Sequence, residues 1–108
     1  MSLKIKKKVK EKAVILHIDG ILDISTTHLL ELYLKELDDN VETLVFDFTN
    51  LEFIDSTGIG SIMNAIYLSQ EKHFKLKLQG INDLTNQFFE MVGLYQILEA
   101  IQGSEMDV

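Results

Sequence analysis

The chain of 108 residues contains no cysteine and no arginine, and each absence removes a class of chemistry. Without cysteine there is no disulfide framework, no thiolate metal site and no thiol nucleophile. Arginine makes the usual bidentate contacts with phosphate and guanine, so its absence argues against direct nucleic-acid binding. No run of eighteen apolar residues occurs, and we therefore expect no membrane span.

Positive charge is concentrated near the N-terminus. Residues 1–12 hold six lysines and one glutamate, whereas the remaining residues hold four lysines and sixteen acids, for a net charge of −7. The first ten residues mix charged with apolar side chains and contain no signal-peptide core, so we expect a cytoplasmic protein. Leu3, Ile5 and Val9 alternate with lysines, which predicts a strand whose lysines protect a sheet edge from aggregation.

We expect a single domain over residues 1–108, with a Lys-rich first strand and turn in 1–12 and a frayed tail in 102–108. Hydrophobic periodicity predicts five strands, at 3–9, 13–19, 43–48, 74–78 and 97–101. Three helices separate the later strands, and Ser25 or Thr26 caps the first helix, while Asn82 or Asp83 caps the third. The order β-β-α-β-α-β-α-β predicts an α/β fold: a mixed, mostly parallel sheet with an N-terminal antiparallel hairpin and crossover helices.

Each predicted helix has an apolar stripe that we expect to face the core. The stripes are Leu30, Tyr33, Leu34 and Leu37 in the first helix, Ile59, Ile62, Met63 and Ile66 in the second, and Leu84, Phe88, Met91 and Val92 in the third. Gly93 is predicted as the C′ residue of the third helix. After the predicted last strand too few residues remain for a stable docked helix.

The sequence assembles no catalyst. Ile54-Asp-Ser-Thr-Gly58 is not a Gly-x-Ser-x-Gly nucleophile elbow, and no Gly-Lys-Ser/Thr follows Gly58 and Gly60 to make a phosphate loop. Three histidines lack an obvious triad partner or second metal ligand, and four acids are spaced too loosely to specify a metal site. These are His17, His28 and His73, and Asp19, Asp23, Asp47 and Asp55. We therefore expect no enzyme activity, no metal and no cofactor.

The turn before the second helix is the most informative segment. It presents Asp55, Ser56 and Thr57 directly before Gly58 and Gly60. A small hydroxyl at a helix N-terminus can cap free N–H groups, or it can accept a phosphate that the helix dipole favours. The local residues leave both alternatives open. The working surface of such a sheet lies at the C-terminal ends of its strands, where a second turn, Gly20–Asp23, can lie beside it.

From the second strand to the third helix, the chain resembles the STAS domain family, specifically the bacterial anti-sigma factor antagonists. Three segments carry the resemblance, and the Asp-Ser-Thr-Gly-Ile-Gly portion of the second is its specific part. The segments are Gly20-Ile-Leu-Asp23, Phe53-Ile-Asp-Ser-Thr-Gly-Ile-Gly60 and Phe88-Phe-Glu-Met-Val-Gly-Leu94.

The resemblance implies that Ser56 is phosphorylated by an anti-sigma factor that is itself a serine kinase. The unphosphorylated form would bind that anti-sigma factor and free a sigma factor, and a PP2C-type phosphatase would reverse the phosphorylation. The implied partner surface comprises Ile21, Asp23, Asp55, Ser56, Thr57, Gly58 and Gly60. At Ile21 the family commonly has an acidic or polar residue. Two alternatives stay open: a STAS adaptor of another signalling or transport assembly that is not phosphorylated, and a small hydrolase or nucleotide-binding protein.

Overall fold

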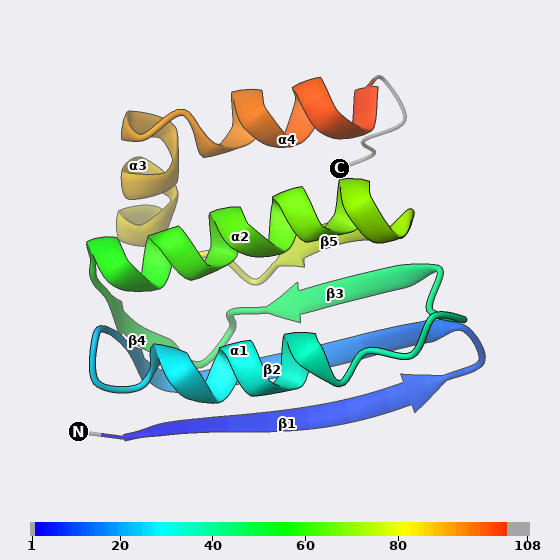
Figure 1. The fold of residues 1–108 in the computed structure, drawn as a ribbon. Coiled ribbons are helices and arrows are strands. Elements are labelled where there is room, and N and C mark those ends of the chain that lie inside the picture. Colours follow the sequence, from blue (N-terminus) through cyan, green and yellow to red (C-terminus); the bar gives the residue numbers. More distant parts are fainter. Residues whose placement is uncertain (1, 104–108) are drawn as a thin grey trace.

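The computed structural model describes residues 2–103, which form five strands and four helices (Figure 1). In chain order the elements are β1 Leu3–Lys10, β2 Ala13–Leu22, α1 Thr27–Lys35, β3 Thr43–Asp47, β4 Leu51–Ile54, α2 Ser56–Lys72, β5 Lys75–Gln79, α3 Asp83–Met91 and α4 Leu94–Gln102. The tail predicted at 102–108 therefore begins inside α4, and residues 104–108 lie outside the described part.

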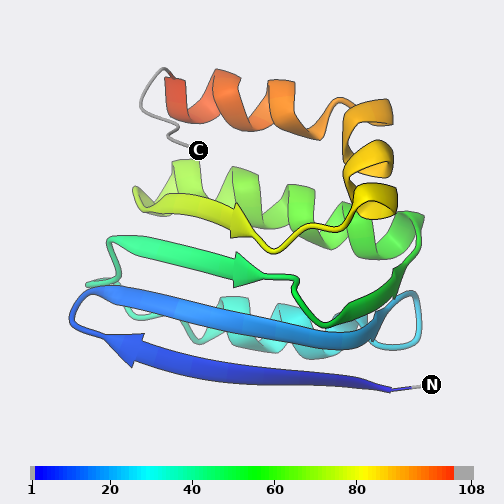
Figure 2. The ribbon, with the colours of Figure 1, turned by 180° about the vertical axis from the view of Figure 1, so that it is seen from behind.

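The sheet has the mixed topology predicted from the sequence. Its strand order is β1-β2-β3-β5, with β1 antiparallel to β2 and the other pairs parallel. Burial alternates along β2 and β3, because one sheet face packs against the helices and the other does not. The two opposite views show the helices gathered on one side of the sheet, with α4 beyond the β5 edge (Figures 1 and 2).

The first two helical stripes are confirmed by burial, whereas the third is not. Leu30, Leu34 and Leu37 are buried below α1, and Ile59, Ile62 and Ile66 are buried below α2. On α3 the buried residues are Thr85 and Phe89 instead, and the predicted Leu84, Met91 and Val92 are exposed. Phe89 determines which side of α3 faces the core, because its ring packs edge-on against the rings of Phe48 and Tyr95. The ring centroids are 5.9 Å and 6.1 Å apart, respectively. Asn82 caps α3 as predicted, accepting the Thr85 N–H at 2.8 Å.

The strand predicted at 97–101 is wrong, because these residues belong to helix α4. Gly93 has φ +73°, which ends α3 as predicted and starts α4 immediately afterwards. Leu94 and Leu98 are buried one turn apart, so the apolar run serves a helix face. The chain therefore does contain a C-terminal helix after its last strand.

The segment 43–54 forms two strands with a turn between them. The Asp47 carboxylate accepts the Thr49 N–H at 3.0 Å and the Thr49 hydroxyl at 2.6 Å, which fixes this turn. β3 pairs with the first half of β2, and β4 pairs with its last three residues, Gly20–Leu22. As a result, the start of α2, which follows β4 directly, lies beside the carboxyl end of β2.

Candidate functional site

The two turns singled out from the sequence lie side by side, as predicted. Leu22 at the end of β2 is the register partner of Ile54 at the end of β4. The Asp55 N–H extends this pairing by donating to the Leu22 carbonyl at 3.2 Å. The β2–α1 turn and the start of α2 therefore form one continuous surface at the carboxyl edge of the sheet (Figure 1).

Asp55 caps α2 and also joins the two turns. One oxygen of its carboxylate, Oδ1, accepts the Gly58 N–H at 2.8 Å, and the other, Oδ2, accepts the Ile24 N–H at 3.2 Å. The first bond satisfies an N–H that the helix leaves without a partner, and the second holds the β2–α1 turn in place. The cap is thus a carboxylate rather than the hydroxyl of Ser56 or Thr57.

Ser56 is the first residue of α2, and its side chain is exposed. Among the side-chain hydrogen bonds within residues 2–103, none involves the Ser56 hydroxyl. Ser56 is also more exposed than the neighbouring Thr57, which is half-buried. The hydroxyl consequently stands in solvent at the positive end of the helix dipole. An added anion is electrostatically favoured at such a position.

The β2–α1 turn is held by its own side chains. The Asp23 carboxylate accepts the Ser25 N–H at 2.9 Å and the Ser25 hydroxyl at 2.7 Å. The Thr26 hydroxyl donates to the Ile21 carbonyl at 2.8 Å and accepts the Asp23 N–H at 2.9 Å, so Thr26 braces the turn and does not cap α1. The hydrogen bond from the Ser25 hydroxyl is the main reason that the pKa of Asp23 lies below its usual value. Asp23 is therefore a fixed negative charge on this surface.

The two glycines of the site differ sharply in their surroundings. Gly58 is buried, and a Cβ there would lie 2.5 Å from the Leu22 carbonyl oxygen and 2.8 Å from Cγ1 of Ile54. Gly60 is exposed, and a Cβ there would meet nothing within 4 Å. Gly58 is therefore buried below the surface, and its lack of a side chain lets α2 start close to β2. Gly60 lies on the outer side of α2 and leaves that side without a projecting side chain.

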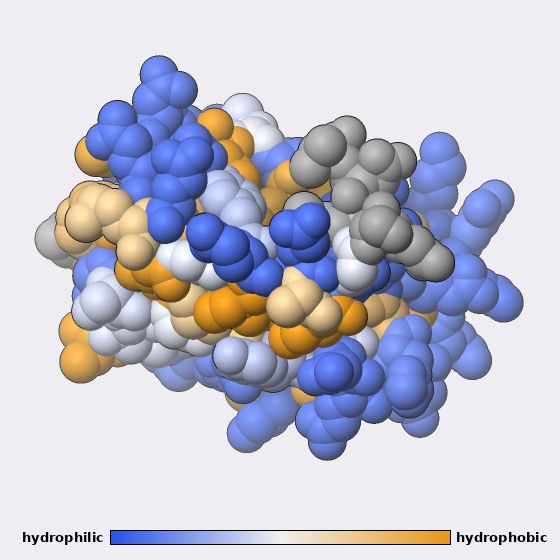
Figure 3. Space-filling model, turned by 90° about the horizontal axis from the view of Figure 1, so that it is seen from above, coloured by the Kyte–Doolittle hydropathy of each residue, from blue (hydrophilic) through white to orange (hydrophobic). Residues whose placement is uncertain are grey.

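Two exposed apolar side chains accompany this surface, and sequence reasoning did not single them out. Ile24, in the β2–α1 turn, is 74% exposed, and Phe53, on β4, is 52% exposed. Ile21, which was singled out, is half-buried. An apolar residue inside a polar turn was the available signal for Ile24. Seen from above, apolar side chains reach the surface at the end of the molecule where α2 begins and across the middle of this face, whereas the opposite end is mostly hydrophilic (Figure 3).

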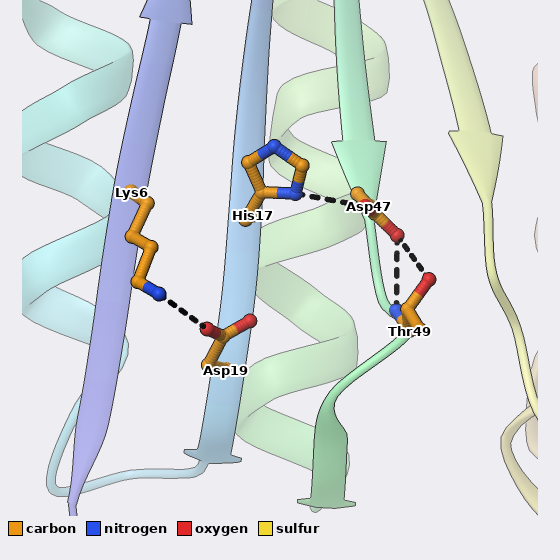
Figure 4. Close-up of polar contacts among 5 residues, drawn as sticks. All are labelled: Lys6, His17, Asp19, Asp47 and Thr49. Atoms are coloured by element: carbon orange, nitrogen blue, oxygen red, sulfur yellow. Dashed lines mark hydrogen bonds and ion pairs between the residues drawn. The ribbon is translucent and has the colours of Figure 1, made fainter.

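A histidine–carboxylate pair lies elsewhere, on the helix-free face of the sheet (Figure 4). His17 Nδ1 lies 2.8 Å from Asp47 Oδ2, a partner that the sequence did not reveal. The Thr49 hydroxyl bonds to the same carboxylate and not to the imidazole, so the three groups do not make a nucleophile–base pair. Burial acts to raise the pKa of Asp47, but hydrogen bonds from Thr49 and His17 outweigh it and hold the pKa below its usual value.

Residues 2–103 contain no group of three or more His, Asp or Glu side chains arranged to hold a metal ion. Over the same residues, no helix combines the length and the apolar character that crossing a membrane requires.

Comparison with known proteins identifies relatives of the whole fold. A model of the STAS domain matches residues 4–107. The anti-sigma-B factor antagonist of Staphylococcus aureus (strain NCTC 8325 / PS 47) is 25% identical, over 99% of this chain and 100% of that protein. Human prestin is 34% identical over 79 residues, which are 63% of this chain and 11% of prestin.

Two solved structures of SpoIIAA share the fold at 17% sequence identity, one described as the anti-sigma factor antagonist SpoIIAA and the other as a Bacillus cell fate determinant. The unphosphorylated form superposes with a TM-score of 0.64, over 94% of this chain and 99% of that one. The phosphorylated form superposes with a TM-score of 0.68, over 88% of this chain and 86% of that one.

Proposed function

The chain belongs to the STAS domain family, and we propose that it is an anti-sigma factor antagonist switched by phosphorylation of Ser56. In its unphosphorylated form it binds an anti-sigma factor that has serine kinase activity, and a sigma factor is released. Phosphorylation of Ser56 ends this binding, and a PP2C-type phosphatase restores it. The protein acts by binding and not as an enzyme.

The observation that carries the proposal is that Asp55, and not Ser56, caps helix α2. Asp55 supplies the helix cap, so the neighbouring hydroxyl has no structural task that a phosphate would interrupt. Ser56 is exposed at the first helical position, where a kinase can reach it. The proposed partner surface consists of Ile21, Asp23, Asp55, Ser56, Thr57, Gly58 and Gly60. Gly58 is buried beneath the others and contributes by allowing α2 to pack closely against β2.

The charge of a phosphate explains how one group can end binding without unfolding the domain. Phosphoserine carries about −1.5 to −2 charge at pH 7. At the start of α2 the dipole favours this charge by roughly 0.3–1 kcal/mol. Within an interface the same group must be desolvated beside Asp23 and Asp55, and every ~1.4 kcal/mol of penalty lowers affinity tenfold.

The relatives favour this function over the adaptor alternative. The Staphylococcus aureus antagonist is matched along its full length, whereas the match to prestin covers 11% of that protein. Of these two relatives, the one that is matched along its whole length is therefore the one named as an anti-sigma factor antagonist.

The direct test is incubation of the chain with its cognate kinase and ATP, followed by phosphosite mapping. We expect one phosphate, on Ser56, and none on the Ser56→Ala variant. Absence of modification at both Ser56 and Thr57 would contradict the switch. Hydrolysis of a nucleotide or ester by the chain, lost in Ser56→Ala, would instead favour the enzyme alternative.

A binding measurement separates a switch from a structural role. Ser56→Asp should weaken binding of the anti-sigma factor about tenfold or more while changing the melting temperature little. Gln70→Glu is a matched control, because it adds one negative charge on an exposed position of the same helix, far from its start. A large fall in melting temperature with unchanged affinity would show that Ser56 is a structural residue.

A further inference from the structure

The sheet face opposite the helices, which we call the open face, is strongly basic in a chain that is acidic overall. Side chains of residues paired directly across strands share a face, so the strand registers define its members. Six lysines and two aspartates lie there, giving a net charge of +4 with His17 neutral. They are Lys4, Lys6, Lys8, Lys10, Lys75 and Lys77, with Asp19 and Asp47.

Two complete rows of this face have lysines at both ends and no charge between them. One row runs Lys8, Ile15, Val45, Lys77, and the next runs Lys10, Ala13, Thr43, Lys75. The outer lysines belong to β1 and β5, which lie three strand spacings, about 14 Å, apart. The middle positions are partly buried although no helix covers them, because lysine stems lie over neighbouring apolar surface.

Among the residues that the structure describes, the lysines of these rows have no charge partner, whereas the acids of the open face do. Lys6 pairs with Asp19 at 3.9 Å, and Asp47 bonds to His17 at 2.8 Å (Figure 4). Within residues 2–103, no ion pair involves Lys8, Lys10, Lys75 or Lys77. Four lysines without an ion pair among the described residues therefore flank an uncharged strip at the end of the sheet where β2, β3 and β5 begin. The strip consists of Ala13, Ile15, Thr43 and Val45.

From this arrangement we infer that the open face is a second docking surface, which takes an acidic amphipathic helix of a partner protein. A helix with its side chains is about 10–12 Å across, which fits between the lysines of β1 and those of β5, about 14 Å apart. Apolar residues of such a helix would contact Ile15 and Val45, and carboxylates on its two flanks would meet the lysines.

The other candidate occupants fit less well. An anionic membrane would repel the remainder of an acidic chain, and the strip offers no large exposed apolar side chain to insert. β1 from a second copy would place lysines opposite lysines. The open-face strip also lies at the opposite end of β2 from Ser56, about 30 Å of strand away, so both surfaces can be occupied together.

The test is an NMR titration of the isotope-labelled chain with a synthetic helical peptide that has leucines at i, i+3, i+4 and i+7 and glutamates on both flanks. We expect shifts at the amides of Ile15, Thr43 and Val45, and weaker binding as salt is raised. The Lys75→Glu/Lys77→Glu variant should lose about tenfold in affinity. Ser56→Asp should bind the peptide as the wild type does, which keeps this test separate from the proposed switch.

Lys35→Glu/Lys72→Glu is the matched control, since it changes the net charge equally at two helix ends away from the open face. It should bind the peptide with nearly wild-type affinity and, like the test variant, should keep the circular dichroism spectrum of a folded chain. Absence of binding, equal losses in the two double variants, or shifts confined to the start of α2 would overturn the inference. Binding to phosphatidylglycerol vesicles without binding to the peptide would overturn it as well.

Discussion

The start of α2 and the open face of the sheet hold their charges in opposite ways. At the start of α2, the carboxylates of Asp55 and Asp23 accept backbone N–H groups and are fixed in position. On the open face, Lys8 and Lys77 extend without a charge partner among the described residues. Fixed negative charges make binding sensitive to one added phosphate, while exposed lysines attract an acidic surface through electrostatic steering.

The largest effect on the rigid region should come from Gly58→Ala. The new methyl group would lie 2.5 Å from the Leu22 carbonyl oxygen, so α2 must move away from β2 or strain against it. We expect the free energy of unfolding to fall by about 1–3 kcal/mol, as for other overpacked sites. Urea denaturation measures the change. A wild-type midpoint would show that the two turns are less tightly joined than the structure indicates.

Asp55→Ala should have the next largest effect. It removes the cap on Gly58 and the bond to Ile24 together, and loss of a helix cap costs about 1–2 kcal/mol. Asp55→Asn is the control, because an amide oxygen can still accept one of these N–H groups. Hydrogen exchange should show faster exchange at the Ile24 amide in Asp55→Ala. Unchanged exchange there would mean that Asp55 does not hold the β2–α1 turn.

On the open face, Asp47→Asn should change the pH dependence of stability. The pKa of Asp47 is held below its usual value of about 3.9, so its carboxylate contributes stability above about pH 4. That contribution is lost as the pH falls through the lowered pKa. We expect a cost of about 1 kcal/mol at neutral pH that shrinks in acid. Thermal melts between neutral and acidic pH give the measurement, and a constant difference at every pH would contradict the assignment.

Local patterns in the sequence were sufficient to predict the hairpin, two of the later strands, β3 and β5, and the turn that holds Ser56, whereas β4 was not predicted as a separate strand. Alternation of lysine with apolar residues along β1 and β5 is a consequence of strand geometry, and burial alternates in this way along β5 and the first half of β1, whereas the second half of β1 is exposed throughout. The Asp55–Gly60 turn was also recognisable, because a cap residue followed by glycines before an apolar-faced helix is a local signal.

Features that depend on distant contacts were not predictable in this way. The mostly apolar segment 97–101, which includes Glu99, is too short to distinguish a strand from a helix, and packing of Leu94 and Leu98 decides for the helix. The orientation of α3 depends on where Phe89 contacts Phe48, which lies far earlier in the chain. The bond from Asp55 to Ile24 likewise joins residues that only the pairing of β4 with β2 brings together.

The smallest expected change in stability, and one of opposite sign, is that of Gly60→Ala. A Cβ at Gly60 would meet nothing within 4 Å, and glycine inside a helix costs roughly 0.5–1 kcal/mol relative to alanine, so the variant should be more stable by about that amount. The wild-type chain therefore keeps a destabilising residue on an exposed helix face. If the partner's backbone approaches α2 closely at this point, the same methyl group should weaken binding of the anti-sigma factor while it raises the melting temperature. Equal affinity for the two proteins would remove Gly60 from the proposed surface and leave Ser56, with the two fixed carboxylates, as its centre.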